Sequence, residues 1–163
     1  AMQCFTFSRA ALPTISPIKK IFMRYKPDYI FHLAAQPLVI ESYVEPLKTW
    51  ETNVIGTLNL LESVKNYSKK CAIVSVTTDK VYKNKEWIHG YRENDELGGY
   101  DPYSSSKACS EFVIQSYQHA FFPVNKFNEH QKAISVARAG NIIGGGDWSS
   151  NRLVPDIVKS ILN

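Results

Sequence analysis

The sequence predicts an α/β fold with a parallel sheet. Three apolar runs have the length of strands, and each ends in small or hydroxyl residues: 28–35, 71–78 and 133–140. Longer segments with helical periodicity separate these runs. Strands that alternate with long helices are joined by right-handed crossovers, so we expect about three to four parallel strands with flanking helices.

Each predicted helix has a local signal. Ser16 and Pro17 form a cap followed by a first-turn proline, so a helix should run from there to about Arg24. Pro46 opens a second helix over about 46–67. Apolar periodicity predicts further helices over 103–120 and roughly 153–162. The recurring apolar positions are Leu47, Trp50, Val54, Leu58, Leu61 and Val64 in the second helix, and Ala108, Phe112, Ile114 and Tyr117 in the third. The polar segments 123–132 and 144–152 are predicted to be loops.

The predicted sheet is incomplete. A doubly wound, Rossmann-like sheet has two βαβαβ halves, with a glycine-rich turn after its first strand. This sequence contains one half and no G-x-G-x-x-G or G-x-x-G-x-x-G. We therefore interpret residues 1–163 as the central and C-terminal part of a dinucleotide-binding domain. We expect it to lack the N-terminal glycine-rich βαβ unit and the C-terminal substrate lobe.

Composition excludes several classes of function. Charged residues make up 21% of the chain and the net charge is +4, with no basic run interleaved with aromatic residues, so we expect no nucleic-acid partner. No apolar stretch approaches the roughly 20 residues of a membrane span. Cys4, Cys71 and Cys109 lack metal-ligand spacing, so we expect no metal site and a reducing, cytoplasmic location.

The stretch "YDPYSSSKACSE" places Tyr103 and Lys107 on one face of a helix, one turn apart. For Tyr103 to accept a proton near neutral pH, its pKa must fall by about three units, roughly 4 kcal/mol. An ammonium about 5 Å away supplies on the order of 3 kcal/mol at an effective dielectric constant of about 20. An oxidised nicotinamide nearby could supply the rest. By itself, Y-x-x-x-K is also common as a purely structural pair.

A second group of polar residues, Thr77, Thr78, Asp79 and Lys80, follows the second predicted strand. The carboxyl ends of parallel strands are the favoured place for a site. A hydroxyl group there can hold a substrate oxygen, and Asp79 and Lys80 can transfer protons. The alternative is an ordinary strand end with a solvated ion pair.

Five runs in order resemble the extended short-chain dehydrogenase/reductase family, in its sugar-nucleotide 4,6-dehydratase branch: "KPDYIFHLAAQPLV", "TNVIGTLNLLE", "SVTTDKVY", "YDPYSSSKACSE" and "ARAGNIIGGGDW". Lys80 stands where thymidine-diphosphate-glucose dehydratases carry glutamate, which makes the resemblance greatest to CDP-glucose 4,6-dehydratases. The resemblance covers about residues 17–162. It implies a lyase that uses NAD to convert CDP-glucose into a 4-keto-6-deoxy sugar nucleotide.

The resemblance also implies residue roles. Tyr103 would take the proton of the C4 hydroxyl, Lys107 would lower the phenol's pKa and hold the nicotinamide ribose, and Thr78 would orient the C4 oxygen. Asp79 would be the acid at C6 and Lys80 the candidate base at C5. The implied cofactor contacts are Leu33, Ala34, Ala35, Gln36, Asn53, Thr77, Tyr103, Lys107 and Ala139, and the implied substrate contacts are Thr78, Asn141, Arg152 and Leu153.

Some residues have a structural alternative. Asn53 can either contact the cofactor or brace its helix. His32 is expected to be packed within its strand, and Trp87 and His89 to belong to a surface loop. Segment 2–13 matches the family poorly, where an acidic residue should contact adenine.

We expect a chain without the glycine-rich turn to bind NAD weakly and to be inactive by itself. The family pairs through two long helices, so a homodimer through about 46–67 and 103–120 is expected. The alternatives are a sugar-nucleotide 4-epimerase or other NAD-dependent epimerase/dehydratase, and a non-catalytic scaffold of the same fold.

Overall fold

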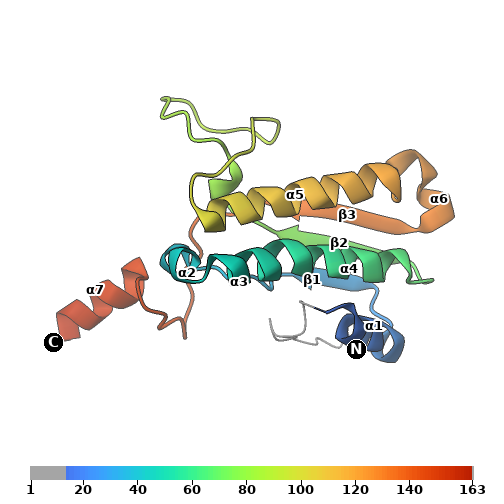
Figure 1. Cartoon of the computed structure of the whole chain (residues 1–163), viewed down its shortest axis with the longest axis horizontal. Coiled ribbons are helices and arrows are strands. Elements are labelled where there is room, and N and C mark those ends of the chain that lie inside the picture. The colour runs from blue at the N-terminus through green and yellow to red at the C-terminus, as the bar shows by residue number, and fades with distance from the viewer. Residues whose placement is uncertain (1–13, 163) are drawn as a thin grey trace.

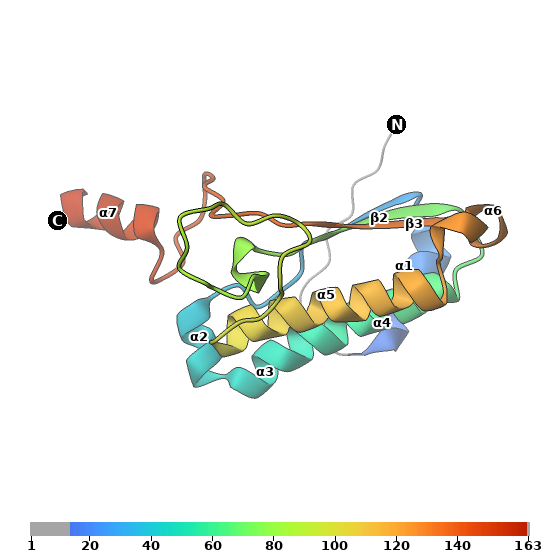
Figure 2. The ribbon, with the colours of Figure 1, turned by 90° about the horizontal axis from the view of Figure 1, so that it is seen from above.

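The computed structural model describes residues 14–162, which form a three-stranded parallel sheet with helices packed on one face (Figures 1 and 2). The strands lie in the order β1 (Tyr29–His32), β2 (Cys71–Val76) and β3 (Lys132–Ala137). The predicted α/β class and parallel sheet are therefore confirmed. The strands are shorter at their carboxyl ends than the apolar runs, because the chain turns away where the small and hydroxyl residues begin.

The long helices lie where their periodicity predicts. Residues 46–65 form one continuous helical segment in which a π-helical turn joins two α-helices. The structure adds one unpredicted helix after β1, and it replaces most of the predicted loop 123–132 with two short helical turns. The helices are α1 (Ile15–Tyr25), α2 (Val39–Val44), α3 (Pro46–Trp50), η2 (Glu51–Ile55), α4 (Gly56–Lys65), η3 (Asp79–Val81), α5 (Pro102–Ala120), η4 (Val124–Lys126), α6 (Phe127–His130) and α7 (Leu153–Leu162).

The core lies between one face of the sheet and helices α1, α4 and α5. Ile73 on β2 packs there with Leu61 and Val64 of α4 and Ile114 of α5, and all four side chains are at most 1% exposed. Burying such a side chain contributes about 1.5–3 kcal/mol, so these contacts fix the helices against the sheet. None of the helices among residues 14–162 is long and apolar enough to cross a bilayer.

The two cysteines in the described residues are free, with Cys71 buried and Cys109 half-buried. The predictions for Cys4 and for segment 2–13 fall outside the described residues. Within the described residues there is no cluster of three or more His, Cys, Asp or Glu side chains suited to a metal ion.

The amino end of α5 is held at the carboxyl edge of the sheet, below the long segment 82–100 (Figure 1). Asp101 caps the helix, because its Oδ1 accepts a hydrogen bond of 2.9 Å from the Ser104 amide, and Pro102 occupies the first turn. Gly99 runs so close to this turn that an added Cβ would lie 2.5 Å from the carbonyl carbon of Ser104. Only glycine permits that approach, which places segment 82–100 directly over the helix start.

Candidate active site

Tyr103 and Thr78 come together although they lie on different elements. Their side chains are hydrogen-bonded, and the charge of Asp79 is close enough to act on the phenol. Thr78 also donates a bond of 3.0 Å from its hydroxyl to Asp79 Oδ1 and accepts one of 3.3 Å from the Lys80 amide, which caps η3. One hydroxyl thus connects the phenol at the start of α5 to the acid at the end of β2.

The pKa of Tyr103 lies above its ordinary value. Burial is the main cause, opposed by the hydrogen bond with Thr78 and by the positive charge of Arg152, while Asp79 and Asp101 raise the pKa further. The sequence led us to expect that Lys107 and an oxidised nicotinamide together lower this pKa; in the chain by itself, burial outweighs the neighbouring charges and the pKa is raised. The physical reason is that a partly desolvated phenol loses hydration of its anion before any neighbouring cation compensates.

Lys107 points beneath the site rather than into solvent. Its side chain is 8% exposed, and its Nζ donates a bond of 3.0 Å to the Val76 carbonyl oxygen, its one acceptor among the described residues. Burial lowers the pKa of Lys107 to about 8, and the carboxylate of Glu111 acts in the opposite direction. This ammonium retains donor capacity at the carboxyl edge of the sheet.

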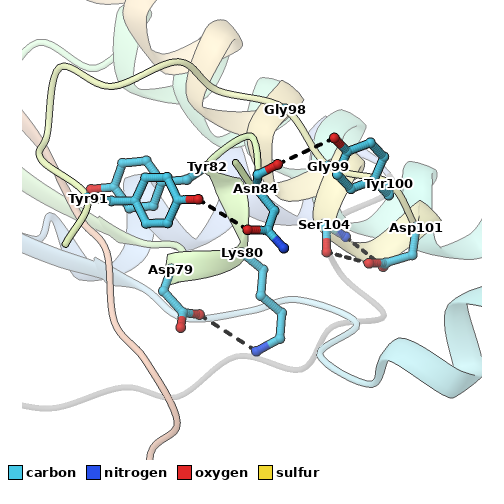
Figure 3. Close-up of a pocket in the computed structure, with 10 residues that line it drawn as sticks. All are labelled: Asp79, Lys80, Tyr82, Asn84, Tyr91, Gly98, Gly99, Tyr100, Asp101 and Ser104. Carbon is cyan, nitrogen blue, oxygen red and sulfur yellow. Dashed lines mark hydrogen bonds and ion pairs between the residues drawn. The ribbon is translucent and has the colours of Figure 1, made fainter. Parts of the chain in front are cut away.

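Asp79 and Lys80 lie side by side at the mouth of the site (Figure 3). Lys80 Nζ is 3.6 Å from Asp79 Oδ1, and the two side chains are 44% and 57% exposed respectively. The role expected for Lys80 as the base at C5 requires that desolvation favour its neutral amine over the ammonium. In the chain as described, this side chain is hydrated and paired instead.

A pocket of about 280 Å³ opens beside this ion pair, beneath segment 82–100 (Figure 3). The rings of Tyr82 and Tyr91 stack with centroids 5.0 Å apart and form one wall. Trp87 and His89 lie exposed in a loop, as the sequence predicts. Those two rings pack against each other outside the pocket lining, with Trp87 also beside Tyr91. The lining residues are Asp79, Lys80, Tyr82, Asn84, Tyr91, Gly98, Gly99, Tyr100, Asp101 and Ser104.

The loop after β1 is fixed by Asn53. Its Oδ1 accepts from the Gln36 amide at 2.8 Å, and its Nδ2 donates to the Gln36 carbonyl oxygen at 3.2 Å and to Ser106 Oγ at 2.9 Å. Asn53 is 2% exposed, so its amide group is fully used within the protein. This geometry favours the bracing alternative for Asn53.

Gln36 is likewise turned inward. It is 3% exposed, and its Nε2 donates to the Leu38 carbonyl oxygen and to Thr49 Oγ1, each at 3.0 Å. By contrast, the Leu33 side chain is 65% exposed at the end of β1, with Ala34 and Ala35 half-buried beside it. The loop therefore presents Leu33 to Ala35, rather than the Gln36 side chain, outward.

His32 is a packed residue, as expected. Its Nε2 lies 3.0 Å from Thr57 Oγ1, and the Thr57 hydroxyl itself donates to the Asn53 carbonyl oxygen at 2.7 Å. Thr57 must therefore accept from a protonated Nε2. Burial first, and then the charge of Lys107, lowers the pKa of His32 to about 4, so the ring is neutral at pH 7.

Of the residues after β3 that were expected to contact cofactor or substrate, two lie near the site and two are exposed away from the protein interior. Ala139 lies at the site, because its carbonyl oxygen accepts a bond of 3.0 Å from the Asp79 amide. Arg152 is near enough for its charge to act on Tyr103. Asn141 is exposed, and Leu153, at the start of the protruding helix α7, is 72% exposed (Figure 2).

Sequence reasoning missed Glu111 and Arg138, which form a buried ion pair behind the site, with 2.7 Å between Arg138 Nη2 and Glu111 Oε2. The sequence contains a feature that could have identified each residue. Glu111 follows Lys107 by one helical turn, and Arg138 interrupts the small residues that end the third apolar run. Thr77 joins the pair, because its hydroxyl donates to Glu111 Oε1 at 2.6 Å.

Comparison with known proteins shows which family this chain belongs to. The sequence model of the family described as GDP-mannose 4,6 dehydratase matches residues 2–129. A CDP-glucose 4,6-dehydratase of Salmonella typhimurium is 48% identical over 146 residues, which are 90% of this chain and 41% of that protein. The chain thus spans about two-fifths of the length of that relative.

Solved structures have the same fold. A dTDP-glucose 4,6-dehydratase double mutant from Streptomyces venezuelae, with NAD bound, superposes with a TM-score of 0.78 at 24% identity and covers 93% of this chain and 42% of its own. A UDP-glucose 4-epimerase from Thermotoga maritima, solved with UDP-glucose, gives a TM-score of 0.70 at 26% identity over 86% of this chain and 41% of its own.

Proposed function

Because this chain belongs to the GDP-mannose 4,6-dehydratase family, we propose that it carries the catalytic centre of an NAD-dependent sugar-nucleotide 4,6-dehydratase, a lyase, with CDP-glucose as the substrate. The hydrogen bond between the side chains of Tyr103 and Thr78, beside Asp79, carries the proposal. It brings a phenol, a hydroxyl group and an acid to the carboxyl edge of one sheet. These are the groups needed to oxidise an alcohol and then eliminate water.

In the proposed reaction, Tyr103 takes the proton of the C4 hydroxyl while Thr78 holds the C4 oxygen. The resulting ketone acidifies the hydrogen at C5. NAD, when bound, supplies the hydride acceptor for C4 and the hydride donor for C6. Burial raises the pKa of Tyr103, so this residue needs an additional positive charge nearby before it can act as a base.

Water leaves across C5 and C6 in the next step. A substrate bound over this ion pair, whose atoms lie 3.6 Å apart, would exclude water from it, and that desolvation would favour transfer of the proton from the Lys80 ammonium to the Asp79 carboxylate, giving a neutral amine and a carboxylic acid. Lys80 then removes the C5 proton and Asp79 protonates the departing C6 hydroxyl. Return of hydride to C6 and of a proton to C5 yields the 4-keto-6-deoxy sugar.

The residues fit the nicotinamide-ribose end of NAD. Lys107 has donor capacity left after its bond to Val76, which suits ribose hydroxyls. Leu33, Ala34 and Ala35 lie outward at the end of β1 and would contact the cofactor, with Ala139 near the nicotinamide. We propose that Gln36, Asn53 and Thr77 shape this surface from below. The sequence contains no G-x-G-x-x-G, so we propose that the 163-residue chain alone binds NAD weakly.

The substrate would lie over Thr78 and Tyr103. The positive charge of Arg152 reaches Tyr103, which supports a place for the substrate's diphosphate there. Asn141 and Leu153 are exposed on the same connection and would complete this contact. The pocket beside Asp79 provides room for part of the substrate.

The closest competing activity is a sugar-nucleotide 4-epimerase. It would use the same oxidation pair but would need no acid–base couple for loss of water, so Asp79 and Lys80 favour dehydration. A non-catalytic scaffold would give no reason for Lys107 to be buried with unused donors. A buried lysine costs stability, and function is the simplest explanation for retaining it.

The test is mass spectrometry of CDP-glucose incubated with NAD and protein, because dehydration removes one water and epimerisation leaves the mass unchanged. We expect the chain alone to be inactive. We expect a chimera, in which it replaces the matching 41% of the Salmonella relative, to lose water from CDP-glucose. The Tyr103→Phe chimera is the control and should be inactive. A folded chimera that epimerises CDP-glucose, or leaves it unchanged, would refute the proposal.

We further propose a cytoplasmic homodimer. Leu47 on α3 and Phe112 on α5 belong to the predicted apolar stripes, yet they are 71% and 53% exposed. Apolar residues that repeat along two neighbouring helices and remain exposed are typical of an interface. The two free cysteines support a reducing location.

A further inference from the structure

Helix α5 carries a buried carboxylate in the turn that follows Lys107. Glu111 lies one turn beyond Lys107 and is 1% exposed. A buried carboxylate without partners would be strongly destabilising, so its contacts indicate what it is for.

Two neighbouring strands supply those contacts. Thr77, at the end of β2, donates its hydroxyl to Glu111 Oε1 at 2.6 Å. Arg138, just after β3, donates from Nε to Oε1 at 3.0 Å and from Nη2 to Oε2 at 2.7 Å. This paired geometry is the strong, directional form of an arginine–carboxylate contact. One carboxylate therefore ties α5 to the ends of both strands.

Arg138 extends the connection to segment 82–100. Its Nη1 donates to the Glu93 carbonyl oxygen at 3.0 Å, and its guanidinium lies 4.6 Å from the centre of the Tyr82 ring. Tyr82 stacks on Tyr91, and both line the pocket in Figure 3. The far end of the ion pair thus supports the aromatic wall of the pocket.

We propose that Glu111 and Arg138 are positioning residues for this site: their ion pair holds Thr77, the helix turn of Lys107 and the Tyr82–Tyr91 wall in one arrangement. The inference deepens the proposed function and rests on it for the roles of Tyr103, Lys107 and Thr78. Neither residue lines the pocket, so both act through the groups that they hold.

The same arrangement has an electrostatic consequence for Lys107. The titratable groups whose charges interact with its ammonium are His32 on β1 and Glu111 on α5. His32 is neutral at pH 7, because burial lowers its pKa to about 4. Glu111 is thus the charged neighbour that keeps Lys107 protonated, against the burial that lowers its pKa to about 8.

The experiment uses the 163-residue chain without substrate. Lysine side chains labelled with ¹³C are titrated by NMR, with the Lys107 signal assigned by its loss in Lys107→Arg, and amide hydrogen exchange is measured over residues 83–99. In Glu111→Gln we expect the pKa of Lys107 to fall by about one unit or more and exchange in segment 83–99 to rise at least tenfold. Glu111→Asp, which retains the charge, should restore most of the pKa.

The matched control is Glu96→Gln. Glu96 is a carboxylate on segment 82–100 that pairs with Lys83 and Lys85 at the surface, so its loss should leave Lys107 unchanged. Should Glu111→Gln fail to fold because Arg138 is left unpaired, Glu111→Gln/Arg138→Gln removes both charges and should show the same rise in exchange, with a smaller fall in the Lys107 pKa because loss of the guanidinium partly offsets loss of the carboxylate. An unchanged Lys107 pKa in folded Glu111→Gln, or unchanged exchange in either folded variant, would overturn the proposal.

These readouts are independent of the proposed function. An inactive chimera with a shifted Lys107 pKa would refute the dehydratase assignment and leave the positioning geometry intact. An active chimera with an unchanged Lys107 pKa in Glu111→Gln would refute the positioning role alone.

Discussion

The Lys107 ammonium donates a hydrogen bond of 3.0 Å to the Val76 carbonyl oxygen, which fastens the first turns of α5 to the last residue of β2. Val76 precedes Thr77 and Thr78, so this bond sets the distance between the helix and the strand end where the phenol and the hydroxyl meet. A surface lysine would leave that distance to packing alone. Here the residue expected to act on the cofactor also aligns the site.

The first prediction concerns pH. The pKa of Lys107 is about 8 in the folded chain, against 10.5 for a free lysine, so the unfolded chain binds more protons between these values. Stability therefore rises with pH over this window, and the cost of burying the charge is fully present below pH 8. Relative to Lys107→Met, the wild type should gain on the order of 3 kcal/mol between pH 7 and pH 11. Urea unfolding of both proteins at several pH values measures this difference, and parallel curves would contradict it.

The second prediction concerns Asn53. Replacing it with alanine leaves the buried Gln36 amide without an acceptor and removes the link to Ser106. We expect a loss of about 1–3 kcal/mol in the free energy of unfolding, measured by urea denaturation. Asn125→Ala, at an exposed position, is the control and should stay within about 0.5 kcal/mol of the wild type. Equal effects of the two changes would be evidence against the bracing role.

The third prediction concerns Gly99. A methyl group there would lie 2.5 Å from the Ser104 carbonyl carbon and the Ser105 amide nitrogen, so the backbone must move. Gly99→Ala should cost about 1–3 kcal/mol of stability. In Gly90→Ala the added methyl group meets nothing within 4 Å, so its effect should be small. Thermal unfolding of the two variants compares them directly, and similar melting temperatures would show that the close approach is not required.

The fourth prediction concerns assembly. Phe112 is 53% exposed on α5, and a charge at this position would be buried at the proposed interface. Phe112→Glu should convert a dimer to a monomer in light scattering at concentrations where the wild type is dimeric. Met23→Glu, on the separate helix α1 and at a position 76% exposed, should leave the dimer unchanged. A monomeric wild type at high concentration would remove the basis for this interface.

The elements of the fold that depend on residues close together in the sequence were predictable. Strand-length apolar runs, a proline in the first turn and apolar steps of three and four locate the sheet strands and long helices, because these signals act within a few residues. Helix α2 was missed because its six residues carry no comparable signal. The site was partly predictable for the same reason: spacing alone puts Tyr103 and Lys107 on one helical face.

The sequence by itself determined the α/β class, the strand and helix order and the placement of Tyr103 and Lys107 one turn apart on α5. Only the tertiary structure decided that Lys107 bonds to Val76, that Asn53 braces Gln36, and that Glu111 joins Thr77 to Arg138. It also decided the direction of the Tyr103 pKa shift, which depends on burial. The physical reason is that hydrogen bonds between distant segments and desolvation arise only when the sheet and helices pack, whereas periodicity and spacing are already present in the unfolded chain.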